Sequence, residues 1–274
     1  MEVIFLTIID AHLHYVPEVK YFNTIADNAE SENSEAGLRA EFHAHHIACG
    51  IVMGNAGLNP EDNRFPDFLR YCIGIEAYEL GKRDNSAAID KIEANLRRPQ
   101  CVGIKLYPGY SSVYITDRRY EPVYELAEKY DKPVAVHTGQ TAGSNAMLRY
   151  SHPLTIDDAA VLHPHVRFVM CHYGNPFLMD AAAVAEKNGN VSVDLSGLIE
   201  GKLSPSYFQE QCHYLEALRT WITYVEDYSK FMFGTDWPLA NYSDYIELTR
   251  QIIPEKHWEA VFRKNAERIY QLHI

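Results

Sequence analysis

The sequence predicts a single (β/α)8 barrel, the TIM-barrel fold, over residues 1–274. Its length of 274 residues is close to the roughly 250 residues of a typical barrel. Eight short apolar runs recur at an average interval of about 31 residues, the length of one βα unit in such a barrel. No linker rich in Pro, Gly or Ser and no shift of composition divides the chain, so we expect one domain.

Each predicted strand is a short run of β-branched or apolar residues that ends at a small or polar residue. In chain order the predicted strands are 8–14, 50–53, 71–75, 102–106, 134–137, 168–171, 191–195 and 231–234. The segments between them have the patterning of helices. In 120–130, for example, Val123, Leu126, Ala127 and Tyr130 fall on one face of a helix. We predict further helices at 38–49, 179–187 and 254–272.

An open doubly wound sheet also alternates strands with helices and is the alternative architecture. Its usual signature is a glycine-rich phosphate loop directly after the first strand. Here the first strand ends in His12-Leu13-His14, and no such loop follows it in the sequence. The barrel is therefore the favoured fold class.

The chain carries 25 Lys and Arg against 37 Asp and Glu, a formal charge of −12. An acidic chain with no basic stripe is not expected to bind nucleic acid. No apolar run reaches the roughly 18 residues that a membrane-spanning helix needs, so we expect no membrane partner. Five scattered cysteines without a CxxC pair indicate a reducing, cytoplasmic setting. We expect a small-molecule substrate, and the sequence leaves open whether the chain forms a homo-oligomer.

Polar side chains end several predicted strands. His12 and His14 are two residues apart on the first strand, so their side chains point to the same side of the sheet, together with that of Asp10. At the carboxyl end of a barrel strand that side is the mouth, where catalytic groups of barrels are found. Two imidazoles so placed can bind one divalent ion, although this pair alone is equally typical of surface or hydrogen-bonded histidines.

The same pattern recurs on other strands. His137 ends the predicted fifth strand, His172 follows the sixth, and Asp236 follows the eighth. Five such residues at one edge of one sheet favour a metal site over five separate strand-end hydrogen bonds. Imidazole and carboxylate ligands fit Zn²⁺ or a similar first-row metal with an open position for water. By contrast, His43, His45 and His46 point in several directions from the predicted helix 38–49, so we expect them to be solvated or partly buried.

The ordered motifs IIDAHLH, GIKLYP, PVAVHTG, FVMCHYGN and FMFGTDWP resemble those of the amidohydrolase superfamily, in its amidohydrolase-related branch of metal-dependent barrels. The closing NAERIYQL is similar to the C-terminal segment of that branch, so the resemblance runs from Ile8 to Leu272. It implies that His12, His14, His137 and Asp236 bind a divalent metal, with Zn²⁺ as our prediction. It also implies that His172 lies beside the metal as an acid/base or as a ligand of a second ion.

The resemblance implies hydrolysis of an amide, lactone or ester bond of a small molecule by a metal-activated water. The alternative that it implies is the non-oxidative decarboxylation of an unsaturated or aromatic acid. In the hydrolase, Asp236 would accept the proton of the water and His172 would assist, so these two are the predicted catalytic residues. We also expect Asp10 to orient one of the imidazoles.

Lys105, at the end of the predicted fourth strand, has three interpretations. Its ammonium group can hold an anionic substrate, its stem can pack in the barrel, or, as in two-metal members of the superfamily, it can be carboxylated and bridge two ions. We predict the substrate-binding role and one metal ion. Tyr107, Tyr173 and Trp237 lie just past strand ends and are predicted to contact the substrate, although packing explains aromatic residues there equally well. Tyr110 and Asn175 are further candidates for the pocket.

Overall fold

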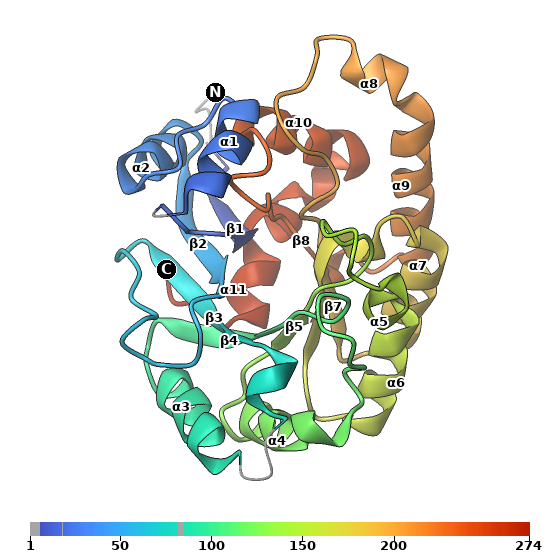
Figure 1. Ribbon diagram of the computed structural model, residues 1–274. Coiled ribbons are helices and arrows are strands. Elements are labelled where there is room, and N and C mark those ends of the chain that lie inside the picture. Colours follow the sequence, from blue (N-terminus) through green and yellow to red (C-terminus); the bar gives the residue numbers. More distant parts are fainter. Residues whose placement is uncertain (1–5, 18, 82–84) are drawn as a thin grey trace. The chain divides into compact units, whose positions relative to one another are not determined.

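The computed structural model describes residues 6–17, 19–81 and 85–274 (Figure 1). Its eight strands belong to one sheet in the order of the chain, which is the strand order of a (β/α)8 barrel and confirms the predicted fold class. The strands are β1 (Ile8–Leu13), β2 (Ile47–Met53), β3 (Leu69–Ile75), β4 (Cys101–Leu106), β5 (Val134–Val136), β6 (Phe168–Met170), β7 (Val191–Asp194) and β8 (Phe231–Met232). β1 and β4 are buried along their whole length, as expected for parallel strands that are covered on both faces.

Tertiary contacts divide the chain into two compact units, Met1–Val52 with Asp194–Ile274, and Met53–Val193, and each is described by itself. That residues 1–274 form a single domain stays a prediction. The first unit contains α1 (Lys20–Asn28), α2 (Glu35–Ala44), α8 (Tyr207–Glu210), α9 (Cys212–Val225), α10 (Tyr242–Ile252) and α11 (Asn265–Ile269). The second unit contains α3 (Ser86–Leu96), α4 (Glu121–Lys129), α5 (Leu148–Ser151), α6 (Leu154–Leu162) and α7 (Leu178–Lys187). The helices predicted at 120–130 and 179–187 are α4 and α7.

The predicted helix 38–49 is wrong in its second half. α2 ends at Ala44, and β2 begins at Ile47. The reason is local, because His46 adopts a left-handed backbone conformation with φ of 56°, which ends the helix. His43 and His46 are exposed and His45 is half-buried, as predicted for a solvated face.

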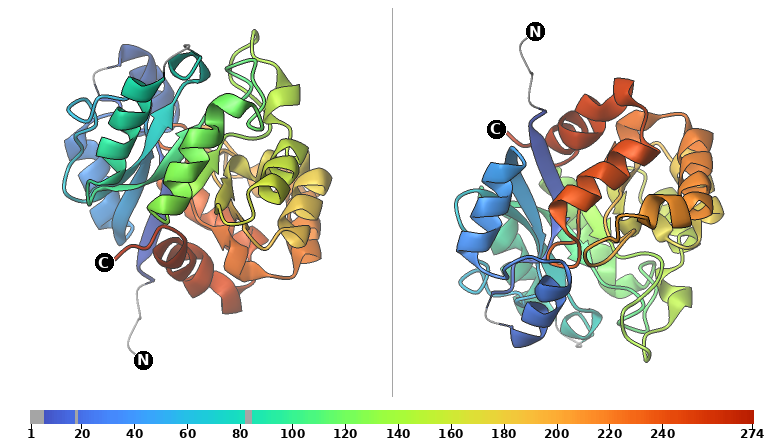
Figure 2. Two further views of the ribbon diagram at one scale, coloured as in Figure 1. Left: turned by 90° about the horizontal axis from the view of Figure 1, so that it is seen from below. Right: turned by 90° about the horizontal axis from the view of Figure 1, so that it is seen from above.

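The predicted C-terminal helix 254–272 is interrupted. It contains a 3₁₀ turn at Glu255–His257 and a π-helical segment at Ala260–Lys264 before α11 begins. The π-helical segment contacts both β1 and β8, and the Val261 carbonyl accepts a hydrogen bond from the Phe233 amide at 2.9 Å. Both views in Figure 2 show this C-terminal part of the chain beside β1.

In the second unit, α3 packs against β3, β4 and α4 (Figure 1). The pairing of β3 with β4 places Gly74 opposite Lys105. No helix in the described part of the chain is long and apolar enough to cross a membrane.

Gly74 allows a close approach of two segments, since a Cβ atom at this position would overlap the carbonyl oxygen of Gly54. We expect Gly74→Ala to lower the free energy of unfolding by about 1–3 kcal/mol, the usual cost of overpacking a tight contact. Gly189→Ala is the matched control, because a Cβ there meets no atom within 4 Å. Chemical denaturation of both variants measures the difference, and equal stabilities would contradict the close approach.

Candidate metal centre

Three of the predicted ligands come together in the first unit. His12 Nε2 lies 3.3 Å from Asp236 Oδ1, and His14 Nε2 lies 3.1 Å from the same oxygen. The three ligand atoms are all within 4.8 Å of one another, and His12 and Asp236 are buried. The sequence prediction of a cluster at the end of β1 is therefore matched by the geometry of this trio.

Backbone pairing sets this arrangement. The Ala11 amide donates to the Phe233 carbonyl at 2.9 Å, the Asp236 amide donates to the His12 carbonyl at 2.8 Å, and the His14 amide donates to the Trp237 carbonyl at 2.7 Å. The chain that follows β8 thus runs along β1 and carries Asp236 to the two histidines. Gly234 permits it, because a Cβ there would lie 3.0 Å from the Cβ of His12.

Asp10 joins the same two segments through its side chain. Its carboxylate accepts hydrogen bonds from the His12 amide at 3.1 Å, from the Thr235 amide at 3.0 Å, from the Thr235 hydroxyl at 2.6 Å and from the Tyr242 hydroxyl at 2.8 Å. Burial raises the pKa of Asp10 to about 6, while these donors act in the opposite direction. Asp10 is therefore ionised at neutral pH and accepts four hydrogen bonds.

The predicted role of Asp10 as the partner of an imidazole is wrong. Asp194 has that position, because its Oδ2 lies 2.9 Å from His12 Nδ1. Asp194 Oδ1 is held in turn by the Ser196 hydroxyl at 2.5 Å and the Ser196 amide at 3.2 Å. A carboxylate on Nδ1 directs Nε2 of His12 toward Asp236 and raises its basicity as a ligand. The sequence carried the signal, since Asp194 ends the apolar run of β7 as the other candidates end theirs.

The trio fits a divalent ion. Two imidazole nitrogens and a carboxylate oxygen are the donors that Zn²⁺ takes in catalytic sites. Ligand atoms about 2.0–2.1 Å from an ion in tetrahedral arrangement are about 3.3 Å apart, which matches the separations of 3.3 and 3.1 Å between each imidazole Nε2 and Asp236 Oδ1. The chemistry and the spacing of the donor set both agree with an ion at this place.

His137 and His172 form a second cluster, in the unit Met53–Val193. Their ring centroids are 4.9 Å apart in an edge-to-face arrangement, and the Tyr110 ring lies 5.0 Å from that of His137. The Thr138 hydroxyl donates to the Cys171 carbonyl and accepts from the Gly174 amide, which ties the end of β5 to the end of β6. That His137 and His172 act on the same ion as the trio stays a prediction.

Three of the predicted site residues have left-handed backbone conformations. The φ angles are 62° at His172, 47° at Tyr173 and 63° at Asp236. Such conformations cost about 1–3 kcal/mol for a residue other than glycine and are concentrated at functional sites. The left-handed conformation of Asp236 is maintained by a backbone hydrogen bond, which the Asp236 amide donates to the His12 carbonyl.

Lys105 is completely buried in the second unit. Its Nζ lies 3.0 Å from Cys171 Sγ and 5.3 Å from the centre of the Tyr107 ring. The polarisable thiol and the face of the aromatic ring partly compensate the Lys105 amino group for the hydration that it loses on burial. Its predicted contact with an anionic substrate stays a prediction.

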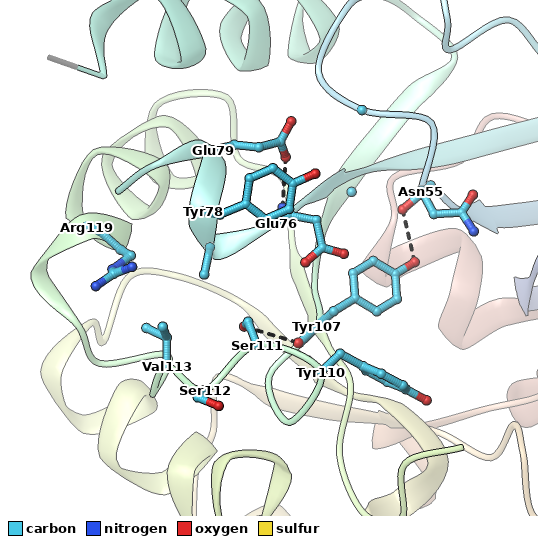
Figure 3. Close-up of a pocket in the computed structure, with 14 residues that line it drawn as sticks. Asn55, Glu76, Tyr78, Glu79, Tyr107, Tyr110, Ser111, Ser112, Val113 and Arg119 are labelled. Carbon is cyan, nitrogen blue, oxygen red and sulfur yellow. Dashed lines mark hydrogen bonds between the residues drawn. The ribbon is translucent and has the colours of Figure 1, made fainter. Parts of the chain in front are cut away.

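A cavity of about 620 Å³ opens in the second unit (Figure 3). Tyr107 and Tyr110 line it, and the Tyr107 hydroxyl donates to the carbonyls of Met53 and Gly54 at 3.1 and 2.9 Å. Tyr173 and Trp237 are completely buried. The substrate contacts predicted for these aromatic residues stay predictions, and burial favours packing for the last two.

The sequence profile of a family described as Amidohydrolase matches residues 80–272. No curated protein matches the chain. Among solved structures, the chain is similar to an uncharacterized TIM-barrel protein from Bordetella bronchiseptica, with 21% identity and a TM-score of 0.72 over 97% of this chain and 99% of that one. It is also similar to a probable 2-pyrone-4,6-dicarboxylic acid hydrolase from Acinetobacter baumannii, with 15% identity and a TM-score of 0.67 over 97% and 100%.

A third similar structure is a 5-carboxyvanillate decarboxylase from Novosphingobium aromaticivorans, with 12% identity and a TM-score of 0.64 over 97% of both chains. That protein was solved with bound manganese and 3-methoxy-4-hydroxy-5-nitrobenzoic acid. At these identities the likenesses show the fold, and they include both a hydrolase and a decarboxylase.

The acceptor role of Asp10 can be tested by stability. Asp10→Asn replaces a carboxylate that accepts four hydrogen bonds with an amide that has one acceptor oxygen, so we expect a loss of about 1–3 kcal/mol in the free energy of unfolding. Tyr242→Phe removes only one of the four bonds and should cost about 1 kcal/mol. Urea denaturation measures both. A smaller loss for Asp10→Asn than for Tyr242→Phe would contradict this role.

Proposed function

The chain belongs to the amidohydrolase family, and on that premise we propose that it is a metal-dependent hydrolase that cleaves an amide, lactone or ester bond of a small anionic molecule. The family match confirms the resemblance that the motifs indicate, and family membership indicates an enzyme that performs either hydrolysis or decarboxylation.

The trio of His12, His14 and Asp236 is the observation that carries this proposal, because its donor set and spacing suit a divalent ion. An ion bound there would lower the pKa of a water molecule from about 16 toward 7 and would polarise a substrate carbonyl. We propose Zn²⁺ as the ion, with one ion per chain.

The proposed roles of the side chains follow from their chemistry. Asp194 holds His12 in the tautomer whose Nε2 is available as a ligand. The Asp236 carboxylate accepts the proton of the attacking water and passes it to the leaving group. His172 stabilises the developing oxyanion or assists the proton transfer. The remaining proposed contacts are His137 as a further ligand and Lys105, Tyr107, Tyr173 and Trp237 toward the substrate.

Decarboxylation is the second candidate. The likeness to a decarboxylase with a bound metal and a substituted benzoic acid favours it, because the same ligand set can hold a carboxylate instead of activating water. The proposed ligands serve both reactions, so the products must separate the two.

We expect the purified, metal-loaded protein to hydrolyse members of a panel of lactones, esters and amides in H₂¹⁸O, with one ¹⁸O atom incorporated per turnover as the bond is cleaved by water. Mass spectrometry of the products measures the incorporation. The same assay includes aromatic and unsaturated carboxylic acids. Release of CO₂ from those acids, with no hydrolysis in the first panel, would contradict hydrolysis and support the second candidate.

The ligand role of His137 can be tested by metal content. We expect His137→Ala to lose bound metal and activity together, since removal of one ligand leaves an incomplete coordination shell. The control is His43→Ala, which changes an exposed histidine of α2 and should retain both. Inductively coupled plasma mass spectrometry gives the metal content, and the intact mass reports whether Lys105 is carboxylated. Undiminished metal and full activity in His137→Ala would refute the assignment.

A further inference from the structure

The cavity in Figure 3 is lined by residues of the second unit that directly follow three strands. Gly54 directly follows β2, Glu76 follows β3, and Tyr107 follows β4. In a (β/α)8 barrel the carboxyl ends of the strands carry the reactive and specificity-determining groups. A cavity of about 620 Å³ at this edge has room for a small organic molecule.

One wall of the cavity is aromatic and fixed. The Tyr107 ring is held by its hydroxyl, which donates to the two carbonyls at the end of β2. The Tyr110 ring lies 6.5 Å from it, nearly perpendicular, and its hydroxyl accepts a hydrogen bond from the Ala142 amide at 3.0 Å. His137 lies next to this wall, because the centroid of its ring is 5.0 Å from that of Tyr110. Fixed aromatic faces of this kind suit a planar ring.

The charged groups of the cavity have different surroundings. The Glu79 carboxylate accepts a hydrogen bond from the Glu76 amide at 2.9 Å, and the Arg119 guanidinium is paired with Asp117 at 2.9 Å. The Glu76 carboxylate points into the cavity toward the Tyr107 side (Figure 3). In the capping box of the 3₁₀ turn at Ala77–Glu79, the Glu76 side chain in turn accepts from the Glu79 backbone amide. Burial, together with the nearby carboxylate of Glu79, raises its pKa.

A half-buried carboxylate that faces an aromatic wall is stabilised by a hydrogen-bond donor and destabilised by another anion. We propose that this cavity binds the ring of the substrate, and that Glu76 selects a ring bearing a hydroxyl or amino group over one bearing a second carboxylate. The inference rests on the proposed function, because it assigns the cavity to the substrate of that reaction. It adds a specificity-determining residue that the strand-end histidines do not provide.

Binding of simple ring acids to the metal-loaded protein tests the proposal. The probes are the 3- and 4-substituted benzoates that carry a hydroxyl group, an amino group or a second carboxylate, and isothermal titration calorimetry gives their dissociation constants. We expect the hydroxy- and aminobenzoates to bind at least about tenfold more tightly than the dicarboxylates, since like charges at close range oppose binding. In Glu76→Gln, which keeps the size of the side chain and removes its charge, this ratio should fall toward one.

Glu79→Gln is the matched control, because it removes the same charge at the other carboxylate of the capping box, which points away from Tyr107 (Figure 3). It should leave the ratio near that of the wild-type protein, and Glu76→Ala provides a second variant in case Glu76→Gln folds poorly, as judged by circular dichroism. Equal changes in the two glutamine variants, an unchanged ratio in the Glu76 variants, or no binding of any probe would overturn the proposal. Metal content and ¹⁸O incorporation report on the proposed function separately, so either can fail alone.

Discussion

The buried carboxylate of Asp10 is the interaction on which the candidate metal centre depends. It accepts hydrogen bonds from β1, from Thr235 after β8 and from Tyr242 at the start of α10, so a single side chain connects β1 to two segments more than 220 residues further along the chain. An ionised carboxylate inside a protein is costly unless donors surround it, and the four donors here meet that need. Because the bonds are directional, they also fix Thr235, and with it the position of the next residue, Asp236, relative to His12.

The strained backbone at Asp236 follows from that constraint. A left-handed aspartate is unfavourable by itself, yet its amide is bound by the His12 carbonyl and the flanking Trp237 carbonyl is bound by the His14 amide. The pairing with β1 therefore holds the conformation that brings the carboxylate to the two imidazoles. Asp194 completes the arrangement from another strand by fixing the orientation of the His12 ring. Backbone pairing with β1 thus sets the position of Asp236, and the Asp194 carboxylate sets the tautomer and the orientation of the His12 ring.

Much of this could be predicted from the sequence, and the limits have physical causes. The strands and the cluster of His12, His14 and Asp236 follow from short apolar runs that end in polar residues, because that pattern depends on local periodicity. The partner of the His12 ring cannot be predicted in this way. Asp10 and Asp194 both lie within predicted strands, and only the tertiary structure decides which of them reaches the imidazole. The sequence predicts too long a helix at 38–49, because no glycine or proline marks the left-handed turn at His46. In the interrupted C-terminal helix, the Val261 carbonyl accepts a hydrogen bond from the Phe233 amide, a tertiary contact that the local sequence does not indicate.

In such a fold, a residue that affects substrate specificity, such as Glu76, is harder to predict from the sequence than a metal ligand. It also follows an apolar strand, but a single carboxylate after a strand does not indicate a site until the surrounding cavity is known. The close approach that Gly54 and Gly74 allow brings the ends of β2 and β3 together, and the Tyr107 hydroxyl then bonds to the end of β2. Small residues in the strands thereby shape the space in which Glu76 lies. The ligands of the proposed ion can stay constant while the residues after β2, β3 and β4 change the molecule that the cavity accepts, because loops and strand ends vary with little effect on the barrel.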